Sequence, residues 1–415
     1  MVQAQRVTTG YVGALLTLFL LAMGTAGYGA VTAFKLTLFL WLTGLWLAAL
    51  LLCLVRYRVP LGRPDRWDLL ILGYGGLTLL SGLVHRAPLL GLSRREGPLV
   101  IALYCLIALG CRRFFRPKAG MLHLLGAVMT VWSVIALVQF GGGNPFGFYP
   151  QGLTWQDAGV AYSGAYISTT GNTDLAGALL CLCIPALAGG LIRLPGKSRY
   201  WLALPLGLCT GVLALMEVRG AQLGLLVGGL FALPLLLPVS DNVRHRLWTL
   251  AAGLLVCSLI LVWCVRLPGT LGEAHDLLHG NADQFTGAGR VYIWKHCLAL
   301  IPEQPLLGTG PDLLYTAGLG FERYDPEQNV IFRSSIDTAH NELLNAAVQQ
   351  GIPAALCFLG AILLSIFGKN KSTAARIARA GLLCWSVQAC FGFSMVNTAP
   401  YFWLTLALCA PEGSV

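Results

Sequence analysis

The stretch 289–351 decides the fold class of this chain; it begins GRVYIWKHCLALIPEQPLLGTGPDLL and ends DTAHNELLNAAVQQG. It lies in the longest polar interval of the protein, between apolar segments long enough to span a bilayer. This interval carries Arg290, Lys295, His340 and Glu342. Such ionisable side chains are costly beside a membrane unless they have a role. The combination indicates chemistry on an anionic substrate at a membrane surface.

The composition predicts an all-α integral membrane protein with a single polytopic domain over 1–415. Of the 415 residues, 56% are hydrophobic and only 11% are charged, whereas a soluble domain carries about 25% charged residues. Fifty glycines fit helices that pack closely in lipid. The thirteen cysteines lie in or beside apolar segments, apart from Cys297, and we expect them to be free.

Twelve transmembrane helices are expected, because about 20 apolar residues cross a bilayer as a helix. The first is too long for the apolar core of a signal peptide, so we interpret it as a span. The candidates are 10–31, 36–55, 67–85, 97–111, 119–140, 173–192, 200–217, 220–238, 247–266, 342–367, 378–395 and 398–411.

The distribution of basic residues predicts the orientation. Arginine and lysine gather in every second loop, for example in 56–66, 112–118 and 369–379. The positive-inside rule makes these loops cytoplasmic and puts both termini in the cytoplasm. The net charge of +10 therefore reflects topology, and no basic stripe with interleaved aromatics indicates a nucleic-acid partner.

Two long loops are then expected on the outer side. The loop 141–172 is rich in Gly, Tyr and Ser, and the loop 267–340 carries the polar motifs quoted above. Within the second loop, VYIWKHCLALI has helical spacing and predicts a short helix near the membrane surface, which Pro302 and Pro305 end.

Four outward arginines are candidates for binding phosphate, which a guanidinium contacts in a bidentate manner. Arg219 lies in a very short connection between two spans, Arg290 opens the predicted surface helix, and Arg94 and Arg95 lie in GLSRREGP. Several arginines on one face would suit a pyrophosphate. The alternative is snorkelling or helix capping, which we prefer for Arg86 and Arg94. Lys35 is expected to be an ordinary interfacial or solvated charge.

His340 is the best candidate for a general base, because histidine titrates near neutral pH. Asn341 and Glu342 follow it, and Glu342 would orient the imidazole or satisfy the start of a helix. The alternative for His340 is a polar residue that only satisfies that helix start. His275 and His279 have the i,i+4 spacing of a metal pair, but no third ligand has convincing spacing, so we expect no metal.

Five segments, in order along the chain, resemble the O-antigen ligase family of bacterial membrane proteins. They are GLSRREGPLVIALY (91–104), STTGNTDLAGALL (168–180), VRGAQLGLLVG (218–228), GRVYIWKHCLALIPEQPLLGTGPD (289–312) and AHNELLNAAVQQGI (339–352). The last two are specific as a pair. Asp174 departs from the family pattern, which leaves the role of Asn172 open.

The resemblance implies about twelve transmembrane helices of the integral-membrane (GT-C) glycosyltransferase type and a large outer loop with short helices. It implies a reaction without metal or cofactor, in which a glycan passes from undecaprenyl pyrophosphate to an acceptor hydroxyl with inversion. Arg219 and Arg290 would bind the pyrophosphate, and His340 would act at the hydroxyl. The other substrate-binding residues implied are Arg95, Trp294, Asn341, Glu342 and Asn172.

Competing functions remain open at this stage. A glycan polymerase of the same family differs from a ligase only in its acceptor, which is a glycan, a lipid or a protein. A lipid-linked oligosaccharide flippase usually keeps ionisable residues near the middle of the membrane, whereas here they crowd the outer edge, which favours an enzyme. A non-catalytic scaffold does not account for the motifs. The expected location is the bacterial inner membrane, with the active site outside the cytoplasm.

Overall fold

The computed structural model describes all residues except 25–26, 145, 148–167, 284–285, 326–329 and 413–415. Most of the predicted outward loop 141–172 therefore lies outside the described residues. Within the described part, seven helical segments are long and apolar enough to cross a membrane, which confirms the prediction of an all-α integral membrane protein. They are Val31–Arg56 (α2), Arg66–Val84 (α3), Ala119–Phe140 (α5), Thr173–Arg193 (α7), Lys197–Met216 (η3 and α8), Arg219–Leu236 (α9, η4 and α10) and Asp241–Cys264 (α11).

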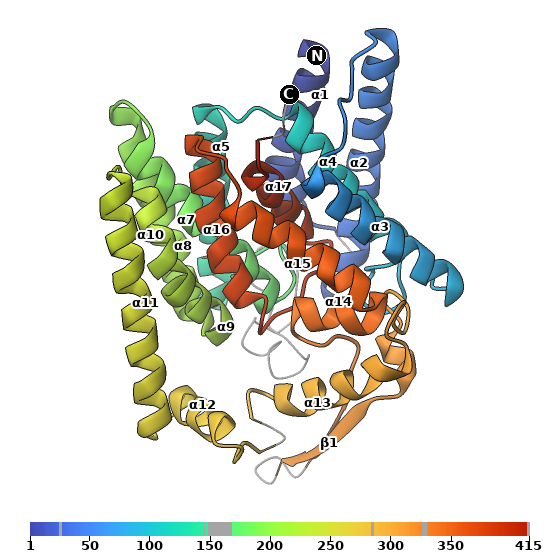
Figure 1. Ribbon diagram of the computed structural model, residues 1–415, viewed down its shortest axis with the longest axis vertical. Helices are drawn as coiled ribbons and strands as arrows, with labels where there is room; N and C mark the ends of the chain where they lie inside the picture. Colours follow the sequence, from blue (N-terminus) through green and yellow to red (C-terminus); the bar gives the residue numbers. More distant parts are fainter. Residues whose placement is uncertain (25–26, 145, 148–167, 284–285, 326–329, 413–415) are drawn as a thin grey trace. The chain divides into compact units, whose positions relative to one another are not determined.

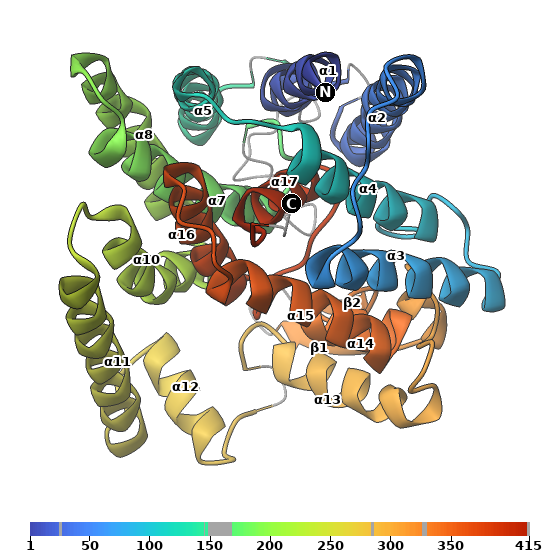
Figure 2. The same cartoon turned by 45° about the horizontal axis from the view of Figure 1, so that its top comes forward.

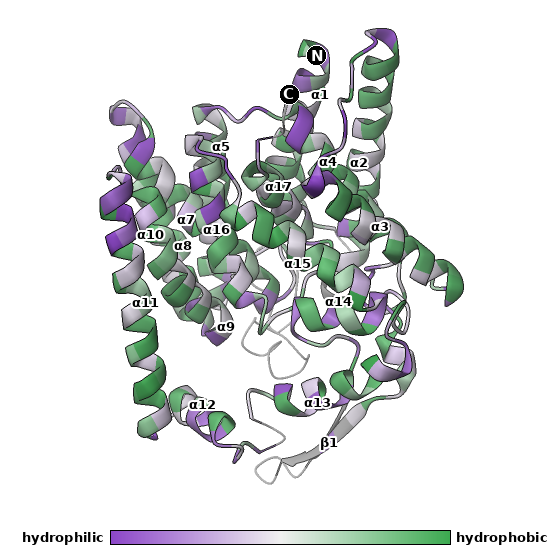
Figure 3. Ribbon diagram, viewed as in Figure 1, coloured by the Kyte–Doolittle hydropathy of each residue, from purple (hydrophilic) through white to green (hydrophobic). Residues whose placement is uncertain are grey.

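Shorter helices account for the other predicted spans. Long apolar helices carry their polar residues at the ends, as α11 does at its start in Figure 3. Between these ends the helix satisfies its own backbone hydrogen bonds, because a hydrocarbon environment offers the backbone no other partner. The shorter helices are Val2–Ala14 (α1) with Leu15–Phe19 (η1), Pro98–Phe114 (α4), Ile352–Phe367 (α15), Thr373–Gln388 (α16) and Ala399–Cys409 (α17).

The predicted span 342–367 is wrong as a single helix. It forms α14 (Glu342–Gln350) and α15, separated at Gly351. The φ of Gly351 is +93°, and a Cβ at this position would collide with the backbone of Leu306. Only glycine accepts this turn readily, so an apolar pattern that looks continuous conceals a break.

A second difference is a small β-hairpin in the large loop, which the sequence analysis did not predict. Gly320–Asp325 (β1) pairs with Val330–Ser335 (β2) in antiparallel register, with Gly320 opposite Ser335. The remaining short elements are 3-10 helices at Tyr28–Ala30 (η2), Ile301–Glu303 (η5) and Leu314–Ala317 (η6).

The chain forms two compact units. The first comprises residues 1–72, 102–238 and 360–415. Its centre is α7, which contacts α5, α8, α16 and α17 (Figure 2). Nearly all of α7 from Leu175 to Leu187 is buried, which is why its hydrophobic residues occur on every face rather than along one stripe.

Lys35 in this first unit is not the interfacial charge that we predicted. Its side chain is buried, with 1% of its surface exposed. The ammonium group donates hydrogen bonds to the carbonyl oxygens of Phe19 at 2.5 Å and Leu20 at 2.9 Å. These carbonyls end the first helical segment and lack intrahelical partners, and a cation is favourable at the negative end of a helix dipole. Lys35 therefore caps the first membrane segment from inside the bundle.

The second unit comprises residues 73–101 and 239–359. It contains α11, Thr270–Leu278 (α12), Arg290–Leu300 (α13), the hairpin and α14. Figure 1 shows α13, α14 and β1 next to one another, and Tyr292 of α13 donates a hydrogen bond of 2.8 Å to the carbonyl of Gly320 at the start of β1. The helix predicted within VYIWKHCLALI is thus confirmed as α13, and it packs with the hairpin in the second unit.

Candidate active site

The two family motifs in the second unit meet through a hydrophobic core beneath α13. Ile293 and Cys297 project from α13 into this core, and Val348 enters it from α14. Leu314, Ile336 and Ala339 complete its buried part. Because Ala339 is fully buried, the neighbouring His340 is held at the boundary between the core and the surface.

Trp294 fixes the peptide that precedes His340. Its indole N–H donates a hydrogen bond of 3.0 Å to the carbonyl of Ala339. This bond joins α13 to the segment that carries the histidine, and the substrate contact expected of Trp294 stays a prediction.

Asn345 holds the same segment from the other side. Its Oδ1 accepts hydrogen bonds from the backbone N–H of Ala339 at 3.1 Å, from the hydroxyl of Thr338 at 3.3 Å and from the amide of Gln349 at 2.6 Å. Because one oxygen serves three donors from both sides of the turn, the loop before α14 is tied to the helix that follows it.

His340 itself has a backbone conformation that is rare for a residue with a side chain. Its φ is +48°, in the left-handed region that non-glycine residues seldom occupy. The next residue, Asn341, is the N-cap of α14, and its Oδ1 accepts a hydrogen bond of 3.0 Å from the N–H of Leu344. Strained residues that the surrounding structure holds in place are concentrated at functional sites, and His340 fits this pattern.

Arg94 and Asp337 form a bidentate ion pair in front of this segment. The Nε and Nη2 atoms of Arg94 each lie 2.7 Å from a carboxylate oxygen of Asp337. The hydroxyl of Ser93 donates a third hydrogen bond, also at 2.7 Å. Arg94 is therefore not the ordinary interfacial charge that we preferred, because it anchors the loop after α3 to the segment containing His340.

Asp312 holds that loop by its backbone. Its carboxylate accepts hydrogen bonds from the N–H of Leu92 at 2.7 Å and of Arg94 at 3.0 Å. Its own N–H donates to the side chain of Gln349 at 2.5 Å. Gly91 has a φ of +88°, and a Cβ there would collide with the Asp312 carboxylate. One buried aspartate thus joins GLSRREGP, PLLGTGPD and α14.

The electrostatics keep His340 neutral. Burial of the imidazole is the largest cause that lowers its pKa, and together with the cations Arg94 and Arg290, which the Asp337 carboxylate opposes, it brings the pKa to about 3. Burial by itself would raise the pKa of Asp337, but the Arg94 guanidinium and the Ser93 hydroxyl bring it below its usual range. The site therefore combines an uncharged histidine with two guanidinium groups and one ionised carboxylate that influence it electrostatically.

Arg290 is the first residue of α13, as the sequence predicted. Gly289, with a φ of +82°, precedes it as the N-cap. The Nη1 of Arg290 donates a hydrogen bond of 2.9 Å to the carbonyl of Gly287, which holds the half-buried side chain near the start of the helix. Of the three residues predicted to be catalytic, the second unit contains Arg290 and His340.

The other predicted residues have separate positions. Arg219 belongs to the first unit, where it is exposed and begins α9. Asn172, also in the first unit, is the N-cap of α7 and accepts a hydrogen bond of 2.8 Å from the N–H of Asp174. Arg95 is exposed, with a φ of +60°, and Glu342 is the first residue of α14.

Residues 204–359 match the family model described as O-antigen ligase. This segment is similar to the O-antigen ligase family. No curated protein matches the chain. The similarity accompanies helices that are long and apolar enough to cross a membrane, as expected of a membrane protein of this kind. The matched segment contains Arg219, Arg290 and His340.

Sequence reasoning on this ligase-like chain missed four residues that build the site. They are Asp337, Asp312, Asn345 and Gln349, and Arg94 was assigned a lesser role than it has. Arg94 and Asp337 are 243 positions apart, so no local spacing joins them. The sequence did offer one signal. GLSRREGP and DTAHNELL both contain charged residues, and a charged residue that becomes buried needs a partner.

The histidine pair in α12 does not form a metal site within the described residues. His275 and His279 stack with ring centroids 4.1 Å apart, and Asp276 pairs with Arg266 at 2.8 Å. No group of three or more His, Cys, Asp or Glu in the described part of the chain is arranged to hold an ion.

The lowered pKa of His340 predicts that this residue stays neutral in the donor-free protein from pH 8 down to pH 5. Histidine-selective ¹³C NMR of the purified protein measures this, with the resonance assigned by its loss in His340→Gln. We expect its chemical shift to be constant over this range, because protonation of a group with a pKa of about 3 requires a lower pH. A titration midpoint between pH 6 and 7 would contradict the electrostatic analysis.

Proposed function

We propose that this protein transfers a glycan from undecaprenyl pyrophosphate to an acceptor hydroxyl on the outer face of the bacterial inner membrane, with inversion and without a metal ion. The observation that carries the proposal is the neutral His340 beside Arg94 and Arg290, held by strained backbone within the family-matched segment. An uncharged imidazole accepts a proton, and guanidinium groups bind the leaving pyrophosphate.

His340 is the general base in this proposal. As the acceptor oxygen attacks the anomeric carbon, its proton passes to the imidazole and the bond from that carbon to the pyrophosphate oxygen breaks. A base with a pKa of about 3 is weak, but Arg290, one of the two cations that lower this pKa, is also proposed to bind the donor pyrophosphate. Binding of the pyrophosphate would therefore raise the pKa of His340 and strengthen the base only when substrate is present.

Arg290 and Arg219 bind the pyrophosphate in this mechanism and stabilise the charge that develops as it departs. Because the pyrophosphate is already a good leaving group, the reaction does not need the pair of carboxylates that glycosidases use. Arg95 and Glu342 are proposed to contact the sugars. Trp294, Asn341 and Asn172 are proposed to bind substrate as well, and each also has a hydrogen bond to backbone. The acceptor is a hydroxyl of a glycan, a lipid or a protein.

The orientation follows from the basic loops and has its own test. With both termini in the cytoplasm, a cysteine at the exposed Glu303 reacts with an impermeant maleimide in intact cells, whereas a cysteine at the exposed Lys371 reacts only after lysis. The parent protein, with Cys257, Cys264 and Cys390 exposed, provides the background for each comparison. The opposite labelling pattern would reverse the orientation and exclude an outward active site.

His340→Ala should lower the turnover of purified, folded protein roughly 10²- to 10⁴-fold, the usual contribution of a general base. Donor affinity should change little, because the proposed pyrophosphate contacts belong to the arginines. His279→Ala is the matched control, since this histidine is exposed in α12, and it should keep the parental turnover. If His340→Ala turns over normally, His340 only caps its helix and the proposed chemistry fails.

Arg219→Ala and Arg290→Ala should each abolish glycan transfer while the protein still inserts, and Arg→Lys should rescue poorly because the planar fork is lost. Arg266→Ala, which removes an exposed arginine paired with Asp276, should retain activity.

The assay is performed with EDTA present, and the parent should remain active because arginines carry the leaving-group charge. Full activity of both Ala variants, or a requirement for Mg²⁺, would contradict the assignment.

A further inference from the structure

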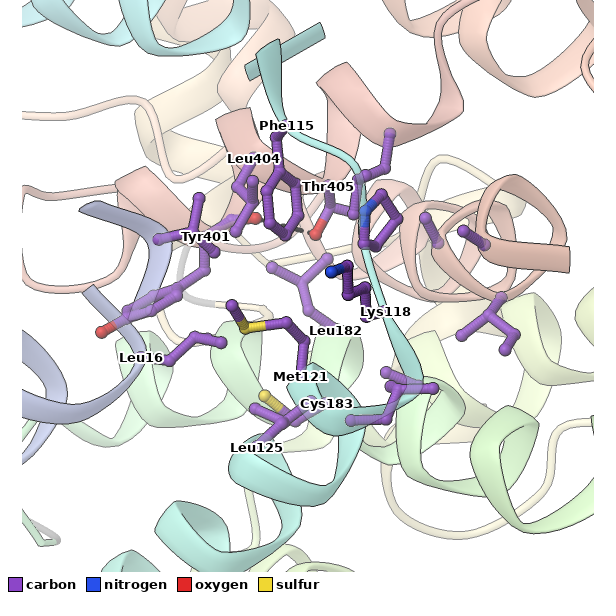
Figure 4. A pocket seen from close by; sticks show the side chains of 18 of the residues that line it. Leu16, Phe115, Lys118, Met121, Leu125, Leu182, Cys183, Tyr401, Leu404 and Thr405 are labelled. Carbon is purple, nitrogen blue, oxygen red and sulfur yellow. Dashed lines mark hydrogen bonds between the residues drawn. The ribbon is translucent and has the colours of Figure 1, made fainter. Parts of the chain in front are cut away.

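The first unit contains an apolar pocket that the proposed reaction does not use. Its volume is about 270 Å³, slightly below the range of about 300–1,000 Å³ typical of small-molecule sites. Figure 4 shows the side chains that surround it, among them Leu16, Met121, Leu125, Leu182 and Leu404. The pocket lies between the first helical segment, α5, α7, α16 and α17.

The mouth of this pocket is cationic. Lys118 is exposed, and among the described residues that line the pocket it is the charged one, with no acidic residue beside it. Figure 4 shows the Lys118 amine turned towards the surrounding side chains. Lys371, also exposed, lies two positions before Thr373, another lining residue.

The neighbouring arginines are already committed to ion pairs inside the protein. Arg112 pairs with both Asp65 and Asp68, and Arg113 lies 2.8 Å from Asp68. Lys118 is thus the cation positioned for an external anion at this pocket. The loops that carry these residues, 112–118 and 369–379, are the basic loops assigned to the cytoplasmic side.

We propose that the pocket binds one acyl chain of an anionic phospholipid from the cytoplasmic leaflet, with the lipid phosphate on Lys118. An apolar cavity does not hold water well, and lipid chains surround a membrane protein at this depth. The volume suits part of one chain rather than a whole lipid. The amine at the mouth selects a headgroup with net negative charge, because basic residues at the cytoplasmic surface attract such lipids.

Photocrosslinking in nanodiscs tests this proposal and does not depend on glycan transfer. The intact protein is reconstituted in phosphatidylethanolamine with a small fraction of phosphatidylglycerol that carries a diazirine near the end of one acyl chain. After irradiation and digestion, we expect adducts on peptides containing Met121, Leu125 or Leu182. The same diazirine chain on phosphatidylethanolamine should give severalfold fewer adducts there.

Two pairs of variants separate the pocket from general lipid contact. Lys118→Glu should remove the preference for phosphatidylglycerol, whereas Lys197→Glu, in another basic loop and exposed, should keep it. Ala186→Trp fills the pocket and should remove the adducts, whereas Ala127→Trp, exposed on α5, should not.

Equal labelling by the two headgroups in the parent, or adducts that persist in a folded Ala186→Trp protein, would overturn the proposal. If Ala186→Trp does not fold, the comparison of Lys118→Glu with Lys197→Glu still decides it.

Discussion

A polar or charged group that leaves water must find a partner, and this constraint accounts for most of the structure. Burying an unpaired polar group costs several kcal/mol, on the order of 2–7 by transfer data. In the membrane segments the helix satisfies the backbone itself. Where a helix ends inside the bundle, another residue supplies the partner, as Lys35 does for the carbonyls of Phe19 and Leu20.

The same constraint builds the candidate active site. Asp312 satisfies the backbone of the loop after α3, Arg94 satisfies Asp337, and Asn345 satisfies the segment before α14. At His340, burial and the nearby arginines outweigh the Asp337 carboxylate and keep the imidazole neutral. A site that combines guanidinium groups with a neutral base is suited to an anionic leaving group, because guanidinium groups stabilise the negative charge that develops on it.

The two faces of the protein use basic residues differently. On the side assigned to the cytoplasm, arginines such as Arg112 are neutralised by aspartates within the fold, and Lys118 remains at the mouth of an apolar pocket. In the outer subdomain, Arg94 and Arg290 are held close enough to His340 to affect its pKa. Topology alone explains the first group, whereas the second requires a substrate or a mechanism.

The sequence by itself determined the membrane class and most of the apolar helices, because hydropathy is a local property, although the predicted span 10–31 is observed at Val2–Phe19. It could not reveal the break at Gly351, where glycine conformation overrides an apolar run, or the burial of Lys35. Tertiary structure alone decided that Arg94 meets Asp337 across 243 positions and that Trp294 and Asn341 hold backbone in place. These contacts depend on which distant segments pack together, and a single sequence does not encode that in any local spacing.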